Sequence, residues 1–166
     1  MSAKTDTPGD ASGSAPSNAS GDGAGRASAG GEGVSLDALR WRRRLVLVRA
    51  GTPSALDALE RLVAERACGL AERDTDVYRA SARSVVPLSR DAVALDEAAR
   101  ATLLEKLDGA DGDVELVLIG KDGGVKERAD DLAALDAFLD AIDAMPMRRA
   151  EMARDADDCP TGGPAR

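Results

Sequence analysis

The sequence predicts one mixed α/β domain, and three observations support this fold class. Two short runs of branched aliphatic residues, Leu45–Val48 and Leu116–Ile119, are typical of strands buried on both faces of a sheet. Apolar residues at intervals of three and four predict helices between and after these strands. A glycine-rich turn follows the second run and predicts a hairpin just before the last helix.

The first half of the domain is predicted to hold a strand, a helix and a second strand. After Leu45–Val48, Thr52 and Pro53 have the side chains that favour the N-cap and the first position of a helix. Gly69 is expected to end this helix, and Thr75–Ser81 is expected to form the second strand. The helix owes its apolar stripe to Leu56, Leu59, Val63, Ala67 and Leu70.

The second half is predicted to hold a helix, a hairpin and a final helix. Asp96 is expected to cap the first of these helices, with Ala99, Leu103, Leu104 and Leu107 on one face and Gly109 at its end. The strand Val114–Ile119, the turn Gly120–Gly124 and the strand Val125–Arg128 then form the hairpin. Asp130 is expected to cap the final helix, and Pro146 to end or bend it. The stripe of that helix contains Leu132, Leu135, Leu139 and Ile142, flanked by Phe138 and Met145.

The predicted order of elements is β-α-β-α-β-β-α. Parallel pairing early in the chain, antiparallel pairing late and helices on both faces of the sheet define a thioredoxin-like sandwich. The thioredoxin-like domain is expected at residues 34–152. Residues 1–33 consist mostly of Gly, Ala and Ser and contain no Val, Leu, Ile or aromatic residue, so we expect a disordered tail. A flexible tail is expected at residues 153–166.

Composition excludes several classes of function. The chain has 166 residues, 22 Lys and Arg against 30 Asp and Glu, a net charge of −8, two Cys and no His. Catalytic triads and zinc sites that use His are therefore impossible, and so is a four-cysteine zinc site. An acidic chain with 2% aromatic residues is unsuited to binding nucleic acid. No apolar run is long enough to span a membrane. A soluble, cytoplasmic protein is expected as the sequence is written, or a periplasmic or secreted one if the true start lies upstream of Met1.

Several short stretches resemble a known family. The strongest are Gly120–Lys126 and Ile142–Arg149, and weaker ones are Trp41 with Arg44–Val48 and Glu72–Asp74. In these stretches the chain resembles a bacterial domain family of unknown function that is similar to the domains of the animal Drs, Urb, equarin and sushi-repeat-containing proteins. The resemblance implies a fold related to thioredoxins and peroxiredoxins and no established activity. It singles out Gly120, Lys121, Asp122, Gly123, Gly124, Met145, Pro146 and Arg148, which we interpret as structural.

The sequence departs from redox thioredoxins at the first helix. Such enzymes need a thiolate at the helix N-terminus, where the helix dipole lowers the thiol pKa. This chain has Gly51, Thr52, Pro53 and Ser54 there, and it has no Cys-x-x-Cys motif. A helix N-terminus with added hydroxyls suits an anion, so Gly51, Thr52 and Ser54 are candidate ligand-binding residues. Simple capping by Thr52 is the alternative.

The two cysteines and the basic clusters have unremarkable interpretations. Cys68 is expected to be a small, half-buried residue, and Cys159 is expected to lie in the flexible tail. The sequence leaves open whether the two cysteines form a disulfide. Arg40, Arg42, Arg43 and Arg44, like Arg148 and Arg149, either hold an acidic partner or form solvated faces, and we favour solvated faces. Trp41 is expected to pack at the edge of the sheet.

These observations favour a non-catalytic thioredoxin-like binding or interaction module. Its partner is an unknown protein or a second copy of the chain, and no cofactor or metal is expected. The alternative is an enzyme of unrecognised type that uses Thr52, Ser54 or Cys68.

Overall fold

Five strands form one mixed sheet in the computed structural model, which describes residues 32–107 and 113–154. Their order is β3-β2-β1-β4-β5, so the first strand is central. The strands are β1 (Arg44–Ala50), β2 (Thr75–Ala80), β3 (Val85–Pro87), β4 (Val114–Ile119) and β5 (Val125–Ala129).

The pairing of the strands confirms the predicted fold class. β1 runs parallel to β2, with Leu45 opposite Asp76, and antiparallel to β4, with Leu45 opposite Ile119. β5 returns antiparallel to β4 as the hairpin partner, and β3 adds a short antiparallel edge beside β2. A parallel βαβ unit joined to an antiparallel ββα unit around a central β1 is the thioredoxin-like arrangement.

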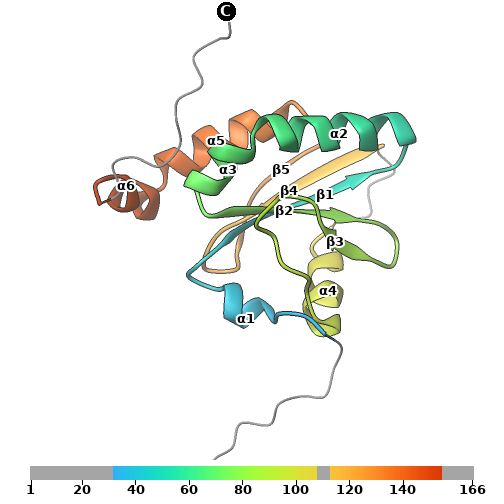
Figure 1. Cartoon of the computed structure of the whole chain (residues 1–166), viewed down its shortest axis with the longest axis horizontal. Coiled ribbons are helices and arrows are strands. Elements are labelled where there is room, and N and C mark those ends of the chain that lie inside the picture. Colours follow the sequence, from blue (N-terminus) through green and yellow to red (C-terminus); the bar gives the residue numbers. More distant parts are fainter. Residues whose placement is uncertain (1–31, 108–112, 155–166) are drawn as a thin grey trace, which may run out of the picture.

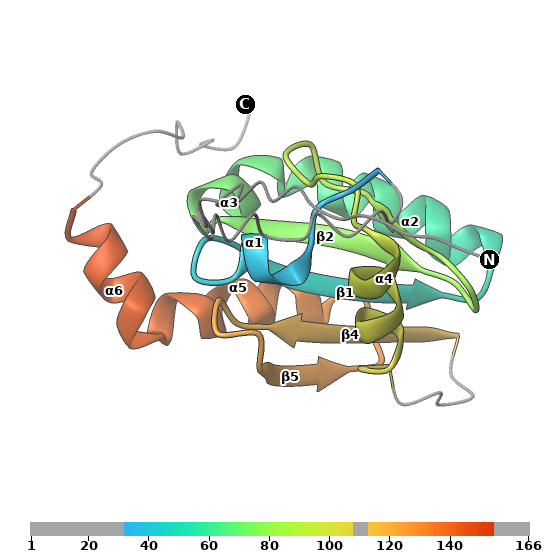
Figure 2. The same cartoon turned by 90° about the horizontal axis from the view of Figure 1, so that it is seen from below.

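Helices cover both faces of the sheet (Figure 1). One face carries α2 (Pro53–Glu65), α3 (Ala67–Glu72) and α5 (Ala134–Ala144), while α1 (Leu36–Leu39) and α4 (Glu97–Leu104) lie on the other (Figures 1 and 2). The last helix, α6 (Pro146–Met152), extends beyond the end of the sheet (Figure 2). No helix in these two described ranges has the length and apolar character needed to cross a lipid bilayer.

Alternation along β1 builds two hydrophobic cores. Val46 and Val48 point toward α2 and α5, where they meet Leu59 and Phe138. The intervening residues Leu45 and Leu47 point to the opposite face, toward α1 and α4. Both faces of β1 are therefore buried, as the continuous apolar run predicts.

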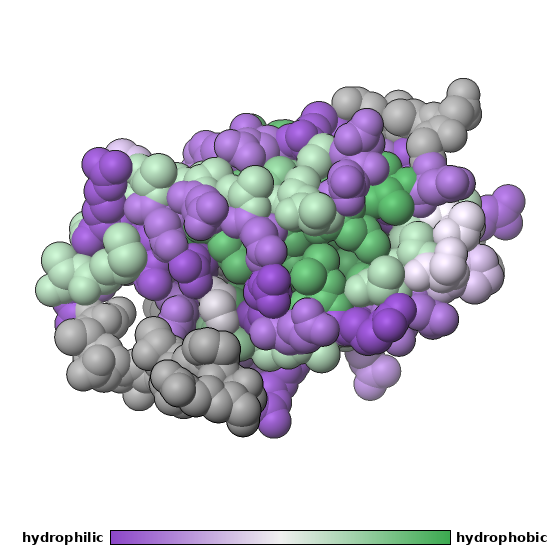
Figure 3. All heavy atoms as spheres, turned by 90° about the horizontal axis from the view of Figure 1, so that it is seen from above, coloured by the Kyte–Doolittle hydropathy of each residue, from purple (hydrophilic) through white to green (hydrophobic). Residues whose placement is uncertain are grey.

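The face formed by α2 and α5 retains some apolar surface. Seen from this side, apolar side chains lie in the middle of the face, between charged ones (Figure 3). A shallow hollow on the described surface is lined there by Ala58, Leu62, Leu132 and Ala133, with Arg61 and Glu65 beside them.

Two predicted helix caps are confirmed. The Thr52 side chain accepts a hydrogen bond from the backbone N–H of Ala55 at 3.2 Å, and Pro53 is the first residue of α2. The Asp96 carboxylate accepts from the N–H of Ala99 at 2.7 Å. Each side chain satisfies a donor that the first turn of a helix leaves unpaired.

Two predicted helix boundaries are wrong, and a third is right but incomplete. Gly69 does not end the first helix, because α2 already ends at Glu65 and Gly69 lies inside α3. Asp130 caps nothing, since α5 begins at Ala134 without a side-chain cap. Pro146 ends α5 as predicted but also occupies the first position of α6, where its missing N–H has no consequence.

Some predictions fall outside the described residues. They concern the tails, apart from residues 32, 33, 153 and 154, together with the helix end at Gly109 and the position of Cys159. The sequence patterns also gave no indication of α1, β3 or α6, which are short elements without a full period of apolar residues.

Candidate binding site

A buried arginine stands at the start of the central strand. Arg44 is the first residue of β1, and only 1% of it is exposed. One terminal nitrogen, Nη1, donates to the backbone oxygen of Arg73 at 2.8 Å and to Glu151 at 3.1 Å, and Nη2 donates to Glu151 at 3.3 Å. The Nε–H of Arg44 has no hydrogen-bond acceptor. Every other buried side-chain nitrogen or oxygen in the described ranges has a hydrogen-bond partner.

A buried lysine shares the same carboxylate. Lys121 follows β4 in the hairpin turn, is 7% exposed, and donates to Glu151 at 2.7 Å and to Asp74 at 2.8 Å. Burial raises the pKa of Glu151, but hydrogen bonds from Lys121 and Arg44, together with their charges, lower it by more. The net pKa is below the ordinary value, so Glu151 is held as a carboxylate.

A second group of charges extends this cluster toward α5. Arg73 donates to both carboxylate oxygens of Asp143, from Nε at 3.0 Å and from Nη2 at 2.5 Å. Arg148 lies 3.4 Å from Asp143 and 3.8 Å from Glu151. We call the combined set the ion-pair network; its members are Arg44, Arg73, Asp74, Lys121, Asp143, Arg148 and Glu151.

The two non-glycine residues with a left-handed backbone in the described ranges both contact Lys121. Trp41 has φ of 65° and donates its backbone N–H to the carbonyl oxygen of Lys121 at 2.7 Å. Asp74 has φ of 46° and accepts the hydrogen bond from the Lys121 ammonium. This conformation is unfavourable for a bulky residue such as Trp, and strained residues concentrate at functional sites.

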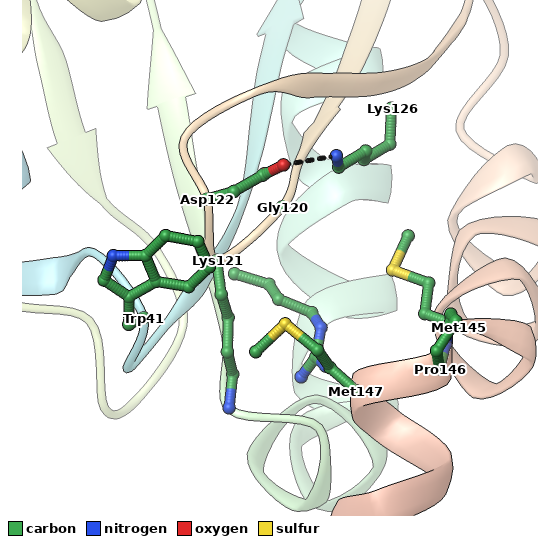
Figure 4. A pocket seen from close by; sticks show the side chains of 9 residues that line it. Trp41, Gly120, Lys121, Asp122, Lys126, Met145, Pro146 and Met147 are labelled. Atoms are coloured by element: carbon green, nitrogen blue, oxygen red, sulfur yellow. Dashed lines mark hydrogen bonds and ion pairs between the residues drawn. The ribbon is translucent and has the colours of Figure 1, made fainter.

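A cavity of about 270 Å³ lies above the network. Trp41 and Lys121 stand on one side of it, and Met145 and Met147, from the junction of α5 and α6, face them across it (Figure 4). Trp41 is 61% exposed, so its indole ring is open to solvent beside this cavity. We call this the Trp41 cavity; its lining residues are Trp41, Arg44, Gly120, Lys121, Asp122, Lys126, Met145, Pro146 and Met147.

Gly120 allows two charged side chains to fold over the hairpin turn. Lys126 and Asp122 form an ion pair with a distance of 2.7 Å (Figure 4). A Cβ atom at Gly120 would lie 2.5 Å from the Cε of Lys126 and 2.7 Å from the carboxylate of Asp122. Any larger residue would therefore displace this part of the wall. The turn itself is closed by Gly123, whose φ of 82° suits glycine.

Several sequence interpretations of this region are wrong. Trp41 is exposed and is not packed at the sheet edge. Arg44 and Arg148 are buried in the ion-pair network and do not belong to solvated faces, and Arg43 pairs with the buried Asp76. Cys68 is exposed on α3, where it was expected to be half-buried. Hydropathy could not show that Arg44 and Arg148 are buried, because the burial of an arginine depends on a carboxylate that is distant in the sequence.

The predicted ligand-binding residues lie at the other end of β1. Gly51, Thr52 and Ser54 follow the last residue of this seven-residue strand, which spans about 20 Å, whereas Arg44 begins it. The Thr52 hydroxyl is used as the cap of α2 and lies 3.3 Å from the hydroxyl of Ser54. The structure therefore brings these residues to one another, and not to the Trp41 cavity.

The fold and this site define a thioredoxin-like domain whose charged cavity lies at the amino-terminal end of the central strand. Residues 35–151 match the model of the family described as Domain of unknown function (DUF4174). The chain belongs to this family. The further resemblance to the animal proteins stays a prediction.

Comparison with curated proteins finds no match. Among solved structures, the chain is similar to the reduced 2-Cys peroxiredoxin of Plasmodium vivax, with 17% identity, a TM-score of 0.46, and coverage of 77% of this chain and 76% of that one. It is also similar to Plasmodium yoelii Prx1a, with 17% identity, a TM-score of 0.43, and coverage of 78% and 86%.

The stretches that carry the sequence resemblance meet at the Trp41 cavity. The ion-pair network draws on Glu72–Asp74, Gly120–Lys126 and Ile142–Arg149, and Arg44 opens the strand segment. The sequence interpretation missed Glu151, because the last helix was expected to end at Pro146. Proline at the first position of a further helix is the signal that indicates α6.

Proposed function

We propose that this domain is a non-catalytic binding module and that the Trp41 cavity is its binding site. The observation that carries the proposal is the exposure of the Trp41 side chain beside the cavity. A large aromatic ring stands 61% exposed on a left-handed backbone, beside a cavity that has both apolar and charged lining residues. Exposed tryptophans beside a pocket are typical anchors of binding surfaces.

The surroundings of Trp41 support a binding role over a purely structural one. Its backbone N–H is held by Lys121, which the ion-pair network fixes in turn, so the turn is rigid while the ring is free to contact another molecule. Met147 is 44% exposed and offers a second apolar contact. Methionine adapts its shape to different apolar partners.

The N-terminus of α2 supports the non-catalytic part of the proposal. The hydroxyls of Thr52 and Ser54 are hydrogen-bonded to one another, and Thr52 also accepts from the helix backbone; within the described residues neither hydroxyl is hydrogen-bonded to a carboxylate or an amine. A hydroxyl nucleophile needs such a base for activation. The enzyme alternative is less well supported for Thr52 and Ser54 for this reason.

Amide and indole N–H chemical shifts test the location of the site. The chain has one tryptophan, so its indole signal reports on the cavity alone. With a library of small neutral, anionic and cationic fragments, we expect binding compounds to shift the Trp41 indole and the amides of Lys121 and Met145. Fragments that shift only Thr52 and Ser54, or no fragment that shifts Trp41, would contradict the proposal.

A matched pair of variants provides the control. Met147 and Met152 are both in α6 and are exposed to a similar extent, 44% and 42%, but only Met147 lines the cavity. Met147→Lys should weaken binding of every fragment that shifts Trp41, and Met152→Lys should leave binding unchanged. Equal effects of the two substitutions would place the fragments elsewhere.

A further inference from the structure

We propose that the Trp41 cavity recognises a small carboxylate with an apolar body. This inference rests on the proposed function and specifies the chemistry of its ligand. Three features of the cavity carry it: an unsatisfied buried donor, the sign of the lining charges and the apolar wall.

The first feature is the Nε–H of Arg44. This residue lines the cavity and is 1% exposed, and both of its terminal nitrogens already have acceptors. Buried donors in folded proteins are almost always paired, and an exception calls for an explanation. The Nε atom has almost no accessible surface, so the wall must shift slightly for a ligand oxygen to supply the acceptor that Nε lacks. The terminal nitrogens show the preference of this guanidinium, because they already bind the carboxylate of Glu151.

The second feature is the charge of the lining. Arg44, Lys121 and Lys126 contribute three cations to the wall, against the single carboxylate of Asp122. The carboxylates that balance Arg44 and Lys121, namely Glu151 and Asp74, are not among the lining residues. An occupant of the cavity therefore meets the positive side of the ion-pair network. A cationic ligand would gain from the face of Trp41, but the lining offers it only the carboxylate of Asp122, which is already paired with Lys126.

The third feature is the apolar wall and its size. Trp41, Met145, Pro146 and Met147 provide aromatic, thioether and ring surfaces without a charge. A volume of about 270 Å³ is below the range of pockets that hold drug-sized ligands and cofactors. The cavity accommodates a short hydrocarbon chain or one apolar side chain, with the carboxylate directed to the cations.

Three probes with the same apolar body test the charge preference: hexanoate, 1-hexanol and hexylammonium. Titrations followed by the Trp41 indole signal should show hexanoate binding roughly tenfold or more tightly than hexanol, the difference that one charge-assisted hydrogen bond provides. Hexylammonium should bind most weakly. Equal affinities for hexanoate and hexanol would overturn the carboxylate preference while leaving the binding site in place. If none of the probes shifts Trp41 and the fragment library also fails, the proposed function itself is contradicted.

Two substitutions locate the carboxylate. Arg44→Lys keeps a cation within reach of Glu151 but removes the Nε–H, and it should weaken hexanoate binding about tenfold with little effect on hexanol. If that variant does not fold, Lys126→Gln changes a partly exposed cation of the same wall and should act in the same direction. Arg61→Gln, on α2 and outside the lining, is the matched control. Hexanoate affinity that responds to Arg61→Gln but not to the lining variants would overturn the assignment.

Discussion

Arg44 and Glu151 lie 107 residues apart and form an ion pair in which both terminal nitrogens of the guanidinium reach the carboxylate. The pair links the first residue of the central strand to α6, the last described helix. Its geometry positions α6 over the end of the sheet, where Met147 forms part of the cavity wall. The position of the wall therefore depends on the ion pairs that Glu151 forms with Arg44 and Lys121.

Loss of the Glu151 carboxylate should destabilise the fold. Glu151→Ala leaves Arg44 and Lys121 buried without their shared partner, and breaking a buried pair in this way costs about 3–5 kcal/mol. Urea unfolding followed by circular dichroism measures this loss. As a control, Asp136→Ala removes the exposed partner of Arg66 and should cost less than about 1 kcal/mol. Equal losses in the two variants would show that the network contributes no more than a surface pair.

The lowered pKa of Glu151 predicts that the free energy of unfolding depends on pH in the acidic range. The folded state lowers the pKa of Glu151, so the unfolded chain binds a proton more readily than the folded chain does. The stabilisation is present above the ordinary value of 4.5 and is lost as the pH falls through the lowered pKa. The free energy of unfolding of the wild type should fall more steeply on acidification than that of Glu151→Ala. Parallel curves would contradict this contribution.

The single tyrosine should lose its proton at a higher pH than an exposed tyrosine does. Tyr78 is fully buried and donates its hydroxyl to the backbone oxygen of Val93 at 2.9 Å, and burial, with the nearby Asp76, raises its pKa to about 12. Because the unfolded pKa is 10, this group stabilises the fold below pH 10, and the contribution is lost as the pH rises through about 12. Tyrosinate absorbance should show a midpoint near 12. A midpoint near 10 in folded protein would mean that Tyr78 is accessible.

The buried apolar residues of α5 should contribute strongly to the stability of the core. Leu139 is buried against α2 and the sheet, so Leu139→Ala should lower the free energy of unfolding by about 2–5 kcal/mol. Chemical denaturation measures the change. Met152→Ala, an exposed residue of α6, is the comparison and should change stability by about 0.5 kcal/mol or less. A small effect at Leu139 would place this face of α5 in solvent.

Thiol chemistry should be absent. Cys68 lies in α3 and not at the N-terminus of α2, the position at which redox thioredoxins need their thiolate. Insulin reduction and hydrogen peroxide turnover should both be at background. Activity in the wild type that disappears in the variant with Cys68→Ser and Cys159→Ser would contradict the non-catalytic proposal.

Residues that act through local patterns were predictable, and residues that act through distant partners were not. Thr52 and Asp96 cap their helices because the donors they satisfy lie three residues away. The run Leu45–Val48 identified the central strand because burial on both faces leaves a continuous apolar signature. Arg44 belongs to the same stretch, but its burial depends on Glu151, and no local pattern indicates that pairing. Trp41 was misjudged for a similar reason, since its outward position follows from a backbone bond to Lys121.

The separation of the two ends of β1 has a consequence for engineering. Thr52 and Trp41 flank opposite ends of a strand of about 20 Å, beyond the distance over which substitutions usually influence one another. Changes at the two ends should therefore be additive. A cysteine introduced at position 52 and a remodelled cavity around Trp41 could be combined in one chain, each optimised without regard to the other.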